Sequence, residues 1–230
     1  MAKVHLVLPA AGVGQRFGLN SPKQYCEING KTVMEWTLSA FEGIDLIDKH
    51  LIALQPDDSL AAAILDRFPK FHVVSGGTER FISVRNALRE LHKTASDQDW
   101  VFVHDVARPC IRLGDILKLA NYCISTGNGA VLGRPITDTI KQRIEDNSWK
   151  TVDRSTLWSV QTPQCFQLGP LLSALNVCIE NNVPITDEAS AIEACGGAMQ
   201  VIEGSADNIK LTYAEDAALI GHYLKQQERY

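Results

Sequence analysis

The chain begins with an apolar run, VHLVL at residues 4–8, and continues directly into PAAGVGQRFGLNSPKQY at residues 9–25. A short apolar run that ends at a proline and glycines is typical of a buried strand followed by a loop. This loop contains three glycines, which let a backbone approach a ligand closely, and two cations, Arg16 and Lys23. The stretch therefore indicates an α/β protein whose first loop contacts an anionic ligand.

The same alternation of apolar runs and amphipathic stretches continues along the chain. It predicts, in chain order, a helix at 32–43, a strand at 50–54, a helix at 57–68, a strand at 71–74, a helix at 80–91, a strand at 100–105, a helix at 115–126 and a strand at 130–133. Such an alternation favours an α/β fold with a Rossmann-like, doubly wound, mostly parallel sheet. Ligands of such sheets lie over the carboxyl ends of the strands, so the loops of interest are 9–24, 75–80 and 105–110.

Residues 134–158 interrupt this pattern with two polar segments, TIKQRI at 139–144 and SWKTVDR at 148–154, joined by EDN. They predict a β-hairpin with too little apolar surface to enter a core. A hairpin alone is only marginally stable in water. We therefore expect residues 1–230 to form one domain with a protruding β-hairpin arm, 134–158, that packs against a second copy of the chain. A solvated hairpin on the same domain is the alternative.

The last third of the chain returns to helical patterns. Thr212 and Glu215 have the spacing of a capping box ahead of AALIGHYL, which predicts a final helix packed on the sheet. Thr186 and Asp187, in the segment PITDEAS, are suited to cap another helix, so we expect a structural role for them.

Composition excludes several classes of protein. The 230 residues have a formal net charge of −5, so no overall basic field attracts nucleic acid. The N-terminal apolar run is too short for a membrane span and lacks the layout of a signal peptide, which predicts a cytoplasmic protein. The six cysteines show no C-x-x-C spacing, so we expect small, often buried side chains in a reducing compartment.

Two kinds of ligand loop are candidates for residues 9–25. A dinucleotide-binding G-x-G-x-x-G turn needs a third small residue and a following helix, but Phe17 takes that position and Pro22 stops a helix. A triphosphate-binding loop fits better, because glycines open the backbone to phosphate and Arg16 and Lys23 supply positive charge. That charge would lie where negative charge grows during attack on phosphorus. A strand-to-helix turn with two solvated basic residues remains the alternative.

This loop resembles that of the sugar-nucleotide-type pyrophosphorylases and cytidylyltransferases, with small residues, then G-x-G-x-R, then P-K. The form that ends in PKQY is similar to the 2-C-methyl-D-erythritol 4-phosphate cytidylyltransferase family of the non-mevalonate isoprenoid pathway. Four more segments follow in the order of that family: GGTERFISV at 76–84, HDVARPCI at 104–111, QTPQCF at 161–166 and NIKLT at 208–212. The resemblance covers essentially the whole chain.

The resemblance implies a nucleotidyltransferase that moves CMP from CTP to 2-C-methyl-D-erythritol 4-phosphate and releases pyrophosphate. It implies Mg²⁺ or another divalent cation as the cofactor. Arg16 and Lys23 would stabilise the transition state, while Arg154 and Lys210 would hold the acceptor's phosphate group. The residues implied to bind the nucleotide are Pro9, Ala10, Ala11, Gly12, Gly77, Ser83 and Asp105.

The remaining segments complete the implied site. Its acceptor half would consist of Arg108, Thr137, Arg154, Thr162 and Lys210. Gly77 and Ser83 would select cytosine, because glycine permits close approach of a flat base and a hydroxyl can both donate and accept. Asp105 ends an apolar strand, where a carboxylate indicates a Mg²⁺ ligand or a ribose contact. Arg108 would pair with Asp105, contact the substrate, or do both.

The arm residues would come from the other subunit of a homodimer, so each hairpin would complete its neighbour's site. Three other functions stay open. A ribitol 5-phosphate cytidylyltransferase would share the nucleotide half, although such relatives tend to read HD-x-VRPF where this chain reads HDVARPCI. A non-catalytic nucleotide-binding module is disfavoured because the charged residues of all the segments are present. A nicotinamide-dependent oxidoreductase is disfavoured by Phe17 and Pro22.

Overall fold

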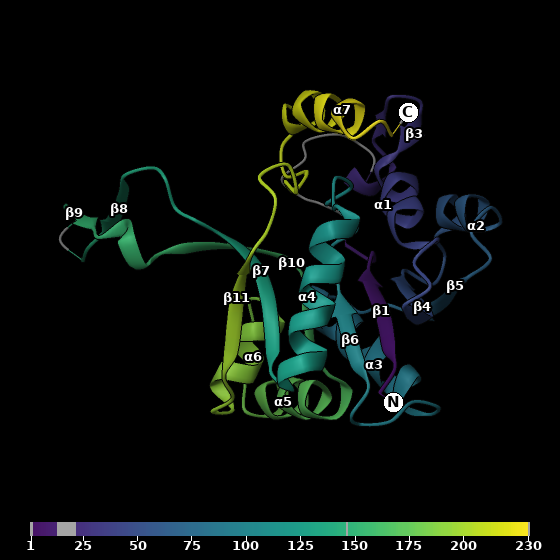
Figure 1. Cartoon of the computed structure of the whole chain (residues 1–230), viewed down its shortest axis with the longest axis horizontal. Coiled ribbons are helices and arrows are strands. Elements are labelled where there is room, and N and C mark those ends of the chain that lie inside the picture. The colour runs from purple at the N-terminus through teal and green to yellow at the C-terminus, as the bar shows by residue number, and fades with distance from the viewer. Residues whose placement is uncertain (1, 13–21, 146, 230) are drawn as a thin grey trace.

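The computed structural model describes residues 2–12, 22–145 and 147–229, and Figure 1 shows how its elements are arranged. At its centre lies a seven-stranded sheet with the strand order β11-β7-β10-β6-β1-β4-β5. Its strands are β1 (Val4–Pro9), β4 (Ile47–Leu54), β5 (Phe71–Ser75), β6 (Trp100–Val103), β7 (Gly129–Pro135), β10 (Trp158–Gln167) and β11 (Met199–Glu203). Only β10 runs antiparallel to its neighbours. The prediction of a mostly parallel sheet is confirmed.

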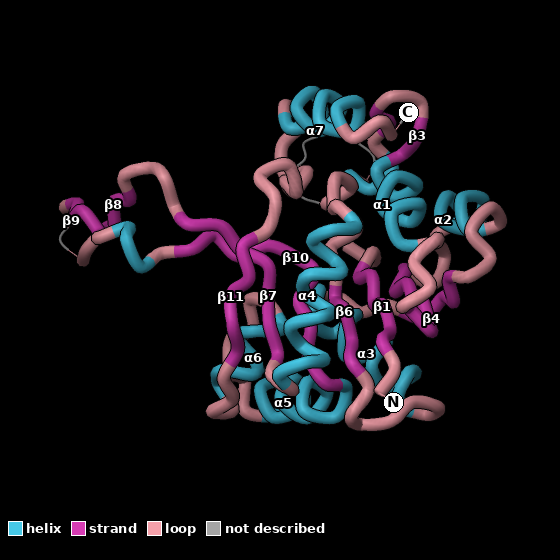
Figure 2. Tube along the Cα trace, viewed as in Figure 1, coloured by secondary structure: helices cyan, strands magenta, loops and turns pink. Residues whose placement is uncertain are grey.

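Helices cover both faces of this sheet (Figure 2). They are α1 (Val33–Phe41), α2 (Ser59–Leu65), α3 (Arg80–His92), α4 (Leu113–Thr126), α5 (Leu168–Glu180), α6 (Glu188–Ala194) and α7 (Asp216–Gln226). One apolar core joins the sheet to α1, α2 and α4, and a second joins it to α3, α5 and α6. Leu6 and Leu8 of β1 enter the first core and Val7 enters the second. This period of two follows from the alternation of side chains along a strand.

Two strands of the sheet, β10 and β11, are absent from the sequence-based prediction. β10 reads WSVQTPQCFQ, and a proline within an apolar run normally argues against an internal strand. The strand accommodates Pro163 by a shift of register against β7 between Val160 and Gln164. Its polar residues Gln161, Thr162 and Gln164 are buried, so the usual hydrophobic signal of an internal strand is missing.

The capping box expected at Thr212 and Glu215 is wrong. Helix α7 begins at Asp216, and Glu215 makes no side-chain capping bond. Instead the carboxylate of Asp216 accepts hydrogen bonds from the backbone N–H groups of Thr212 and Tyr213, each at 2.8 Å. An acidic side chain in the first turn stabilises a helix N-terminus in the same electrostatic sense as a cap.

Helix α7 also packs elsewhere than predicted. Its buried residues Ile220 and Leu224 join a third apolar cluster that includes Trp36 of α1. The helix contacts β2 (Glu27–Ile28), which forms a small antiparallel hairpin with β3 (Lys31–Thr32). The last helix therefore closes the fold over α1 and this hairpin, above the carboxyl ends of the strands, and leaves the sheet faces to other helices (Figure 1).

The predicted hairpin is present and projects from the body (Figure 1). It consists of β8 (Ile140–Arg143) and β9 (Trp149–Val152), which pair only with each other among the described strands. It grows out of β7 and β10, whose pairing runs from Ala130–Cys165 in the body to Pro135–Trp158 at the root of the arm. Trp149 near its tip is 64% exposed, so the arm offers apolar surface away from its own core.

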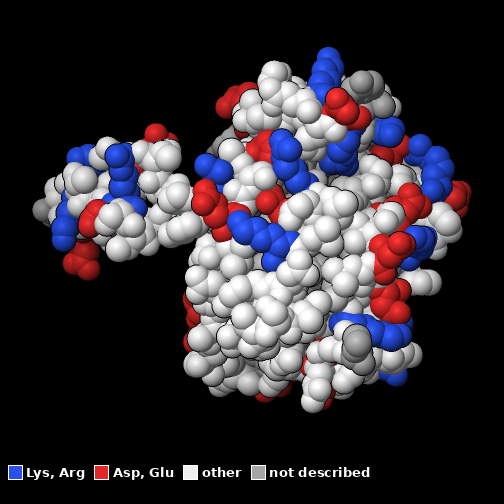
Figure 3. All heavy atoms as spheres, in the orientation of Figure 1, with Lys and Arg blue, Asp and Glu red and all other residues white. Residues whose placement is uncertain are grey.

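The surface and the cysteines agree with the composition. Acidic and basic side chains are interspersed on the face shown in Figure 3. Four cysteines, Cys110, Cys123, Cys165 and Cys178, are buried as expected, and all six are free thiols. None of the helices among the described residues has the length and apolar character that a membrane crossing needs.

Candidate active site

A pocket lies over the carboxyl ends of β1, β5 and β6, where three loops converge. The first loop lines it with Pro9, Ala10, Ala11, Gly12, Lys23 and Gln24. The loop after β5 and the start of α3 contribute Gly77, Thr78, Glu79, Arg80 and Ser83, and the loop after β6 contributes Asp105, Val106 and Ala107. Lys210 closes the pocket from the segment before α7. These loops coincide with the three that the strand pattern selected.

Close packing makes two glycines obligatory at the turn after β5. A Cβ on Gly76 would lie 2.4 Å from the Cβ of Ala11, and a Cβ on Gly77 would lie 2.2 Å from Cγ2 of Ile82. Both distances are far below van der Waals contact. A Cβ on Gly12, by contrast, would meet no described atom within 4 Å. The turn after β5 is thus pressed against the first loop, while no described residue crowds the backbone at Gly12.

Ser83 fixes the same turn from within α3. Its hydroxyl accepts a hydrogen bond from the N–H of Gly77 at 2.9 Å and donates to the carbonyl of Glu79 at 3.2 Å. The residue is 1% exposed but lines the pocket. Since a hydroxyl oxygen has two lone pairs, one acceptor position remains for a donor on a ligand.

The carboxylate of Asp105 is the electrostatic centre of the pocket. Its Oδ1 accepts from Arg80 Nε at 2.8 Å, and its Oδ2 accepts from Lys210 Nζ at 2.6 Å. Arg108, the partner expected from the sequence, is more distant, with Nε 4.0 Å from Oδ2. Burial by itself raises the pKa of Asp105, but the charges of these three cations hold it well below its ordinary value. Asp105 is therefore a permanent anion surrounded by cations.

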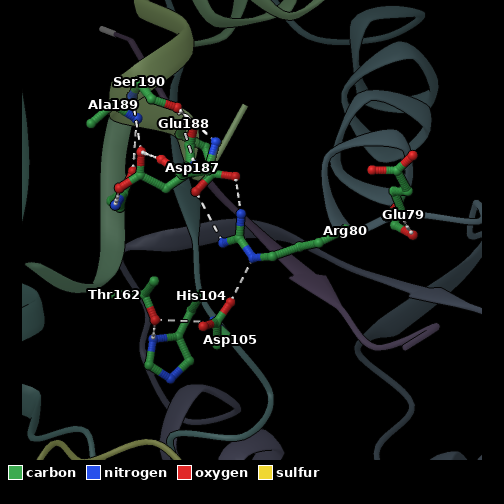
Figure 4. Close-up of polar contacts among 12 residues, drawn as sticks. Glu79, Arg80, His104, Asp105, Thr162, Asp187, Glu188, Ala189 and Ser190 are labelled. Atoms are coloured by element: carbon green, nitrogen blue, oxygen red, sulfur yellow. Dashed lines mark hydrogen bonds and ion pairs between the residues drawn. The ribbon is translucent and has the colours of Figure 1, made fainter. Parts of the chain in front are cut away.

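Arg80 also binds a second carboxylate, that of Glu188 at the start of α6 (Figure 4). Arg80 Nη1 and Nη2 donate to the two oxygens of Glu188 at 2.6 and 3.0 Å. The Glu188 side chain is 1% exposed. Burial lowers the pKa of Arg80, but the charges of Glu188 and Asp105 outweigh it and raise this pKa above its ordinary value. A bidentate, buried pair of this kind fixes the guanidinium in direction as well as in position.

Gln164 of β10 holds the first turn of α6 in place. Its Nε2 donates to Asp187 Oδ2 at 2.8 Å, and its Oε1 accepts from the N–H of Ala189 at 2.9 Å. Asp187 is the N-cap of α6 and forms a reciprocal capping box with Ser190. The expected structural role of Asp187 is confirmed, and the cap delivers Glu188, the next residue, to Arg80.

A chain of hydrogen bonds ties His104 and Thr162 to the backbone on both sides of Asp105. The N–H of Asp105 donates to Thr162 Oγ1 at 3.0 Å, and this oxygen lies 3.1 Å from His104 Nδ1. His104 Nε2 lies 3.1 Å from the carbonyl oxygen of Arg108. Because a carbonyl only accepts, the network assigns the proton to Nε2 and makes Nδ1 the acceptor of the Thr162 hydroxyl. Burial lowers the pKa of His104 to about 4, in keeping with a neutral ring.

The described residues do not fit a resident metal ion at Asp105. Both of its oxygens already accept from cations, and a divalent ion there would face Arg80, Lys210 and Arg108 at close range. No group of three or more His, Cys, Asp or Glu side chains suited to hold a metal occurs among residues 2–12, 22–145 and 147–229. The donor set suits an anionic ligand, which brings its own counter-ions.

The structure brings most of the expected site residues together. Lys23 borders the pocket and donates to the carbonyl oxygen of Leu211 at 3.0 Å, next to Lys210 in the chain. Thr162 and Arg108 lie next to Asp105, at 3.0 Å from its N–H nitrogen and 4.0 Å from its Oδ2, although neither lines the pocket. Arg16 lies outside the described residues. Two expected residues, Thr137 and Arg154, are at the root of the arm, where Arg154 Nη1 donates to the carbonyl oxygen of Thr137. Neither of these two lines the pocket of its own chain.

The sequence does not single out the polar residues that hold Asp105 and its partners in place, which are Arg80, His104, Gln164 and Glu188. Arg80 and Glu188 are 108 positions apart, and each looks like an ordinary charged residue in the first turn of a helix. His104 and Gln164 adjoin the segments that carry the resemblance, but one sequence contains no signal that distinguishes a buried polar bond from a solvated side chain.

Comparison with known proteins gives a consistent result. The family model described as IspD: 2-C-methyl-D-erythritol 4-phosphate cytidylyltransferase matches residues 4–226. The protein of that name from Acinetobacter baylyi is 42% identical over 228 residues, which span 98% of this chain and 95% of that protein. The one from Hahella chejuensis is 43% identical over 226 residues, or 97% of this chain and 94% of that protein.

Solved structures agree with the sequence comparison. A crystal structure titled 4-diphosphocytidyl-2C-methyl-D-erythritol synthase has a TM-score of 0.85 and 37% identity, with 97% of this chain and 99% of that chain covered. The 2-C-methyl-D-erythritol 4-phosphate cytidylyltransferase of Francisella tularensis has a TM-score of 0.81 and 35% identity, with 97% of this chain and 100% of that chain covered.

The buried His104 predicts a loss of stability in acid. The unfolded chain binds a proton at this histidine near pH 6.5, whereas the folded chain binds it only near pH 4. Stability is therefore complete above pH 6.5 and falls by about 1.4 kcal/mol per pH unit between these values, for a total of about 3 kcal/mol. Urea unfolding of the wild type and of His104→Gln between pH 4 and 8 measures this slope.

The comparison isolates His104. Burial also lowers the pKa values of His5 and His50, but both residues remain in the two proteins, so their effect on the pH profile cancels. We expect His104→Gln to be less stable at pH 8 but to lose less stability on acidification. Parallel pH profiles for the two proteins would contradict a neutral, buried His104.

Proposed function

The chain belongs to the 2-C-methyl-D-erythritol 4-phosphate cytidylyltransferase family, and from that premise we propose how its pocket performs the reaction. The enzyme transfers a CMP group from CTP to 2-C-methyl-D-erythritol 4-phosphate in isoprenoid biosynthesis. The products are 4-diphosphocytidyl-2-C-methyl-D-erythritol and pyrophosphate. The observation that carries our assignment of the site is the group of cations around Asp105 at the carboxyl ends of the strands.

CTP binds, in our proposal, in the half of the pocket formed by the first loop and the turn after β5. The triphosphate lies against the backbone of the first loop, from Pro9 to Gly12, where no described residue crowds Gly12. The cytosine lies against Gly77 and Ser83, whose remaining acceptor position suits the exocyclic amino group of the base. Asp105 lies between this half and the acceptor half, within reach of the ribose.

The acceptor binds in the other half of the pocket, beside Lys210. Its phosphate group interacts with Lys210, and its hydroxyl groups lie near Arg108 and Thr162. Arg108 Nε is buried, has no hydrogen-bond partner among the described residues and lies beside Asp105. A buried donor without a partner is costly, so an acceptor oxygen placed there would satisfy it.

The reaction needs positioning and charge stabilisation more than proton transfer. A phosphate oxygen of the acceptor forms a bond to the α-phosphorus of CTP, and the bond from that phosphorus to the leaving pyrophosphate oxygen breaks. A phosphate dianion attacks without a general base. Lys23, together with Arg16 outside the described residues, stabilises the charge that grows on the transferred phosphoryl oxygens. Lys210 and Arg154 hold the nucleophile in line.

Mg²⁺, or another divalent cation, enters in this proposal as part of the CTP substrate. It screens the charges of the triphosphate oxygens, which supply its ligands together with water. This arrangement agrees with the absence of a fitting protein site around Asp105 among the described residues.

We propose further that the enzyme is a cytoplasmic homodimer of one-domain chains, 1–230, joined through the arms 134–158. Thr137 and Arg154 lie together at the root of the arm, away from their own pocket. The arm also exposes Trp149, Trp158 and Ile144, at 64%, 40% and 41%. Burial of such side chains against a partner removes apolar surface from water and brings Arg154 to the neighbouring site.

The choice of acceptor is tested by pyrophosphate release from CTP and Mg²⁺. We expect release with 2-C-methyl-D-erythritol 4-phosphate and none above background with ribitol 5-phosphate. Release with ribitol 5-phosphate alone would leave the assignment of the CTP-binding residues intact and overturn the assignment of the acceptor. No release with either, despite measurable CTP binding, would favour a non-catalytic binding module.

Lys23→Ala tests the role of the first loop. We expect kcat to fall by about a hundredfold or more, because a cation that acts mainly on the transition state is lost. The KM for the acceptor should change far less. Lys93→Ala is the matched control, since Lys93 is exposed and pairs only with Glu90 among the described residues. A normal kcat with a raised KM would assign Lys23 to ground-state binding instead.

A mixture of two inactive variants tests whether the arm completes the neighbour's site. If Arg154 acts in the partner's pocket, a mixed dimer of Arg154→Ala and Lys210→Ala chains contains one intact site and one doubly damaged site. Random pairing then restores about a quarter of the wild-type activity, since half of the dimers are mixed and each has one of two sites intact. No recovery after confirmed subunit exchange, or a solution mass near that of one chain, would refute the shared site.

A further inference from the structure

A group of four charged side chains at the pocket has no net charge of its own. It consists of Asp105 and Glu188, with one negative charge each, and Arg80 and Arg108, with one positive charge each. Among the described contacts, Lys210 joins this group through Oδ2 of Asp105 alone, at 2.6 Å. Its ammonium is thus the surplus cation, one more than the buried carboxylates need.

This balance matters because a buried carboxylate retains whatever cation compensates it. The side chains of Glu188 and Asp105 are 1% and 10% exposed, and a charge in such a place is costly without a partner. Arg80 reaches both carboxylates, with its two Nη atoms on Glu188 and its Nε on Asp105 (Figure 4). Both carboxylates therefore keep a direct partner when Lys210 moves away.

Two other carboxylates near the group do not alter the balance. Glu79 precedes Arg80, but its carboxylate points away from the guanidinium (Figure 4). Asp187 precedes Glu188, and its oxygens accept from Gln164 Nε2 and from the N–H of Ser190 in the helix cap. Neither contacts the Arg80 guanidinium through a hydrogen bond or ion pair among the described residues.

We propose that Arg80 is a positioning residue that frees Lys210 for the acceptor's phosphate group. The proposal rests on the function given above. Without Arg80, Glu188 would lose its cation and Asp105 would keep only Arg108, at 4.0 Å, and the net negative charge of the group would hold Lys210 as a counter-ion. Without both Arg80 and Glu188, the pair Asp105–Arg108 would again be neutral, and Lys210 would be free. The side chain of Lys210 is 34% exposed, which leaves it room to turn from Asp105 to a ligand.

Steady-state kinetics of Arg80→Gln, Arg80→Lys and the double variant Arg80→Gln/Glu188→Gln test this charge balance. We expect Arg80→Gln to raise the KM for 2-C-methyl-D-erythritol 4-phosphate by about tenfold or more, with the KM for CTP changed by less than about threefold. Arg80→Lys keeps the charge and should stay within about threefold of the wild type in both. The double variant should recover most of the loss. Arg89→Gln, on the exposed face of the same helix, is the matched control.

Several results would overturn the proposal while the wild type remains active. A double variant no better than Arg80→Gln, or equal rises in the KM for CTP and for the acceptor, would show that Arg80 contacts substrate itself or acts only in folding. Thermal melts identify variants that do not fold. If Arg80→Gln does not fold, the other two variants carry the test. A large rise in the KM for the acceptor in Arg80→Lys or in the double variant then overturns the role of Arg80 but not the proposed function. A wild type that releases no pyrophosphate would instead refute the proposed function.

Discussion

The negative charge of Asp105, buried where β6 ends, organises this edge of the molecule. A carboxylate at 10% exposure must be compensated, and the compensating groups come from distant parts of the chain. Arg80 is 25 positions away and Lys210 is 105 positions away. Their convergence requires that α3 start directly below the turn after β5 and that the segment before α7 return over the sheet. One charge thus links the start of α3, the sheet and the closing segment.

The residues that contact Asp105 are themselves held in place by further hydrogen bonds and ion pairs. Gln164 holds the cap of α6, the cap presents Glu188, and Glu188 fixes Arg80 from the side opposite Asp105. On the backbone side, Thr162 and the neutral ring of His104 hold the N–H of Asp105 and the carbonyl of Arg108. Each of these polar groups is paired and most are buried, which rigidifies a site more than any one bond does. The side chains around Asp105 and Glu188 are consequently held in fixed positions, whereas the more exposed side chain of Lys210 has room to move.

Much of the fold could be predicted from the sequence because apolar runs of strand length alternate with helical patterns. The parallel strands β1, β4, β5 and β6 follow this rule. The hairpin arm was predicted from its departure from the rule, because two polar segments there are joined by a turn signal. β10 could not be predicted, since its buried residues include glutamines, a threonine and a proline whose partners lie elsewhere in the chain. The start of α7 differs from the prediction for a local reason. The carboxylate of Asp216, one position past Glu215, accepts from the N–H of Thr212, which the expected capping box would have paired with Glu215, and from the N–H of Tyr213.

The residues of the candidate site also fall into those that could be predicted from the sequence and those that could not. Glycines and cations in short loops, such as Gly12, Gly77 and Lys23, could be predicted because local backbone geometry and the resemblance both indicate them. Glu188 and Arg80 could not, because their importance lies in a contact across 108 positions. The proposed role of Arg154 in a neighbouring site would likewise depend on an assembly, whereas a single chain shows only that this residue lies away from its own pocket.

The arm is an extension of two strands of the central sheet, β7 and β10. β7 and β10 pass without a break from the body to the root of the hairpin, and their register shifts between Val160 and Gln164, where Thr162 holds Asp105. The length of the arm and its direction therefore depend on different residues. Residues inserted at the hairpin tip lengthen the arm and leave its direction unchanged. Residues inserted near the register shift would rotate the arm and displace Thr162 together, so changes at the root are constrained by the bond from Thr162 to Asp105 in the same chain.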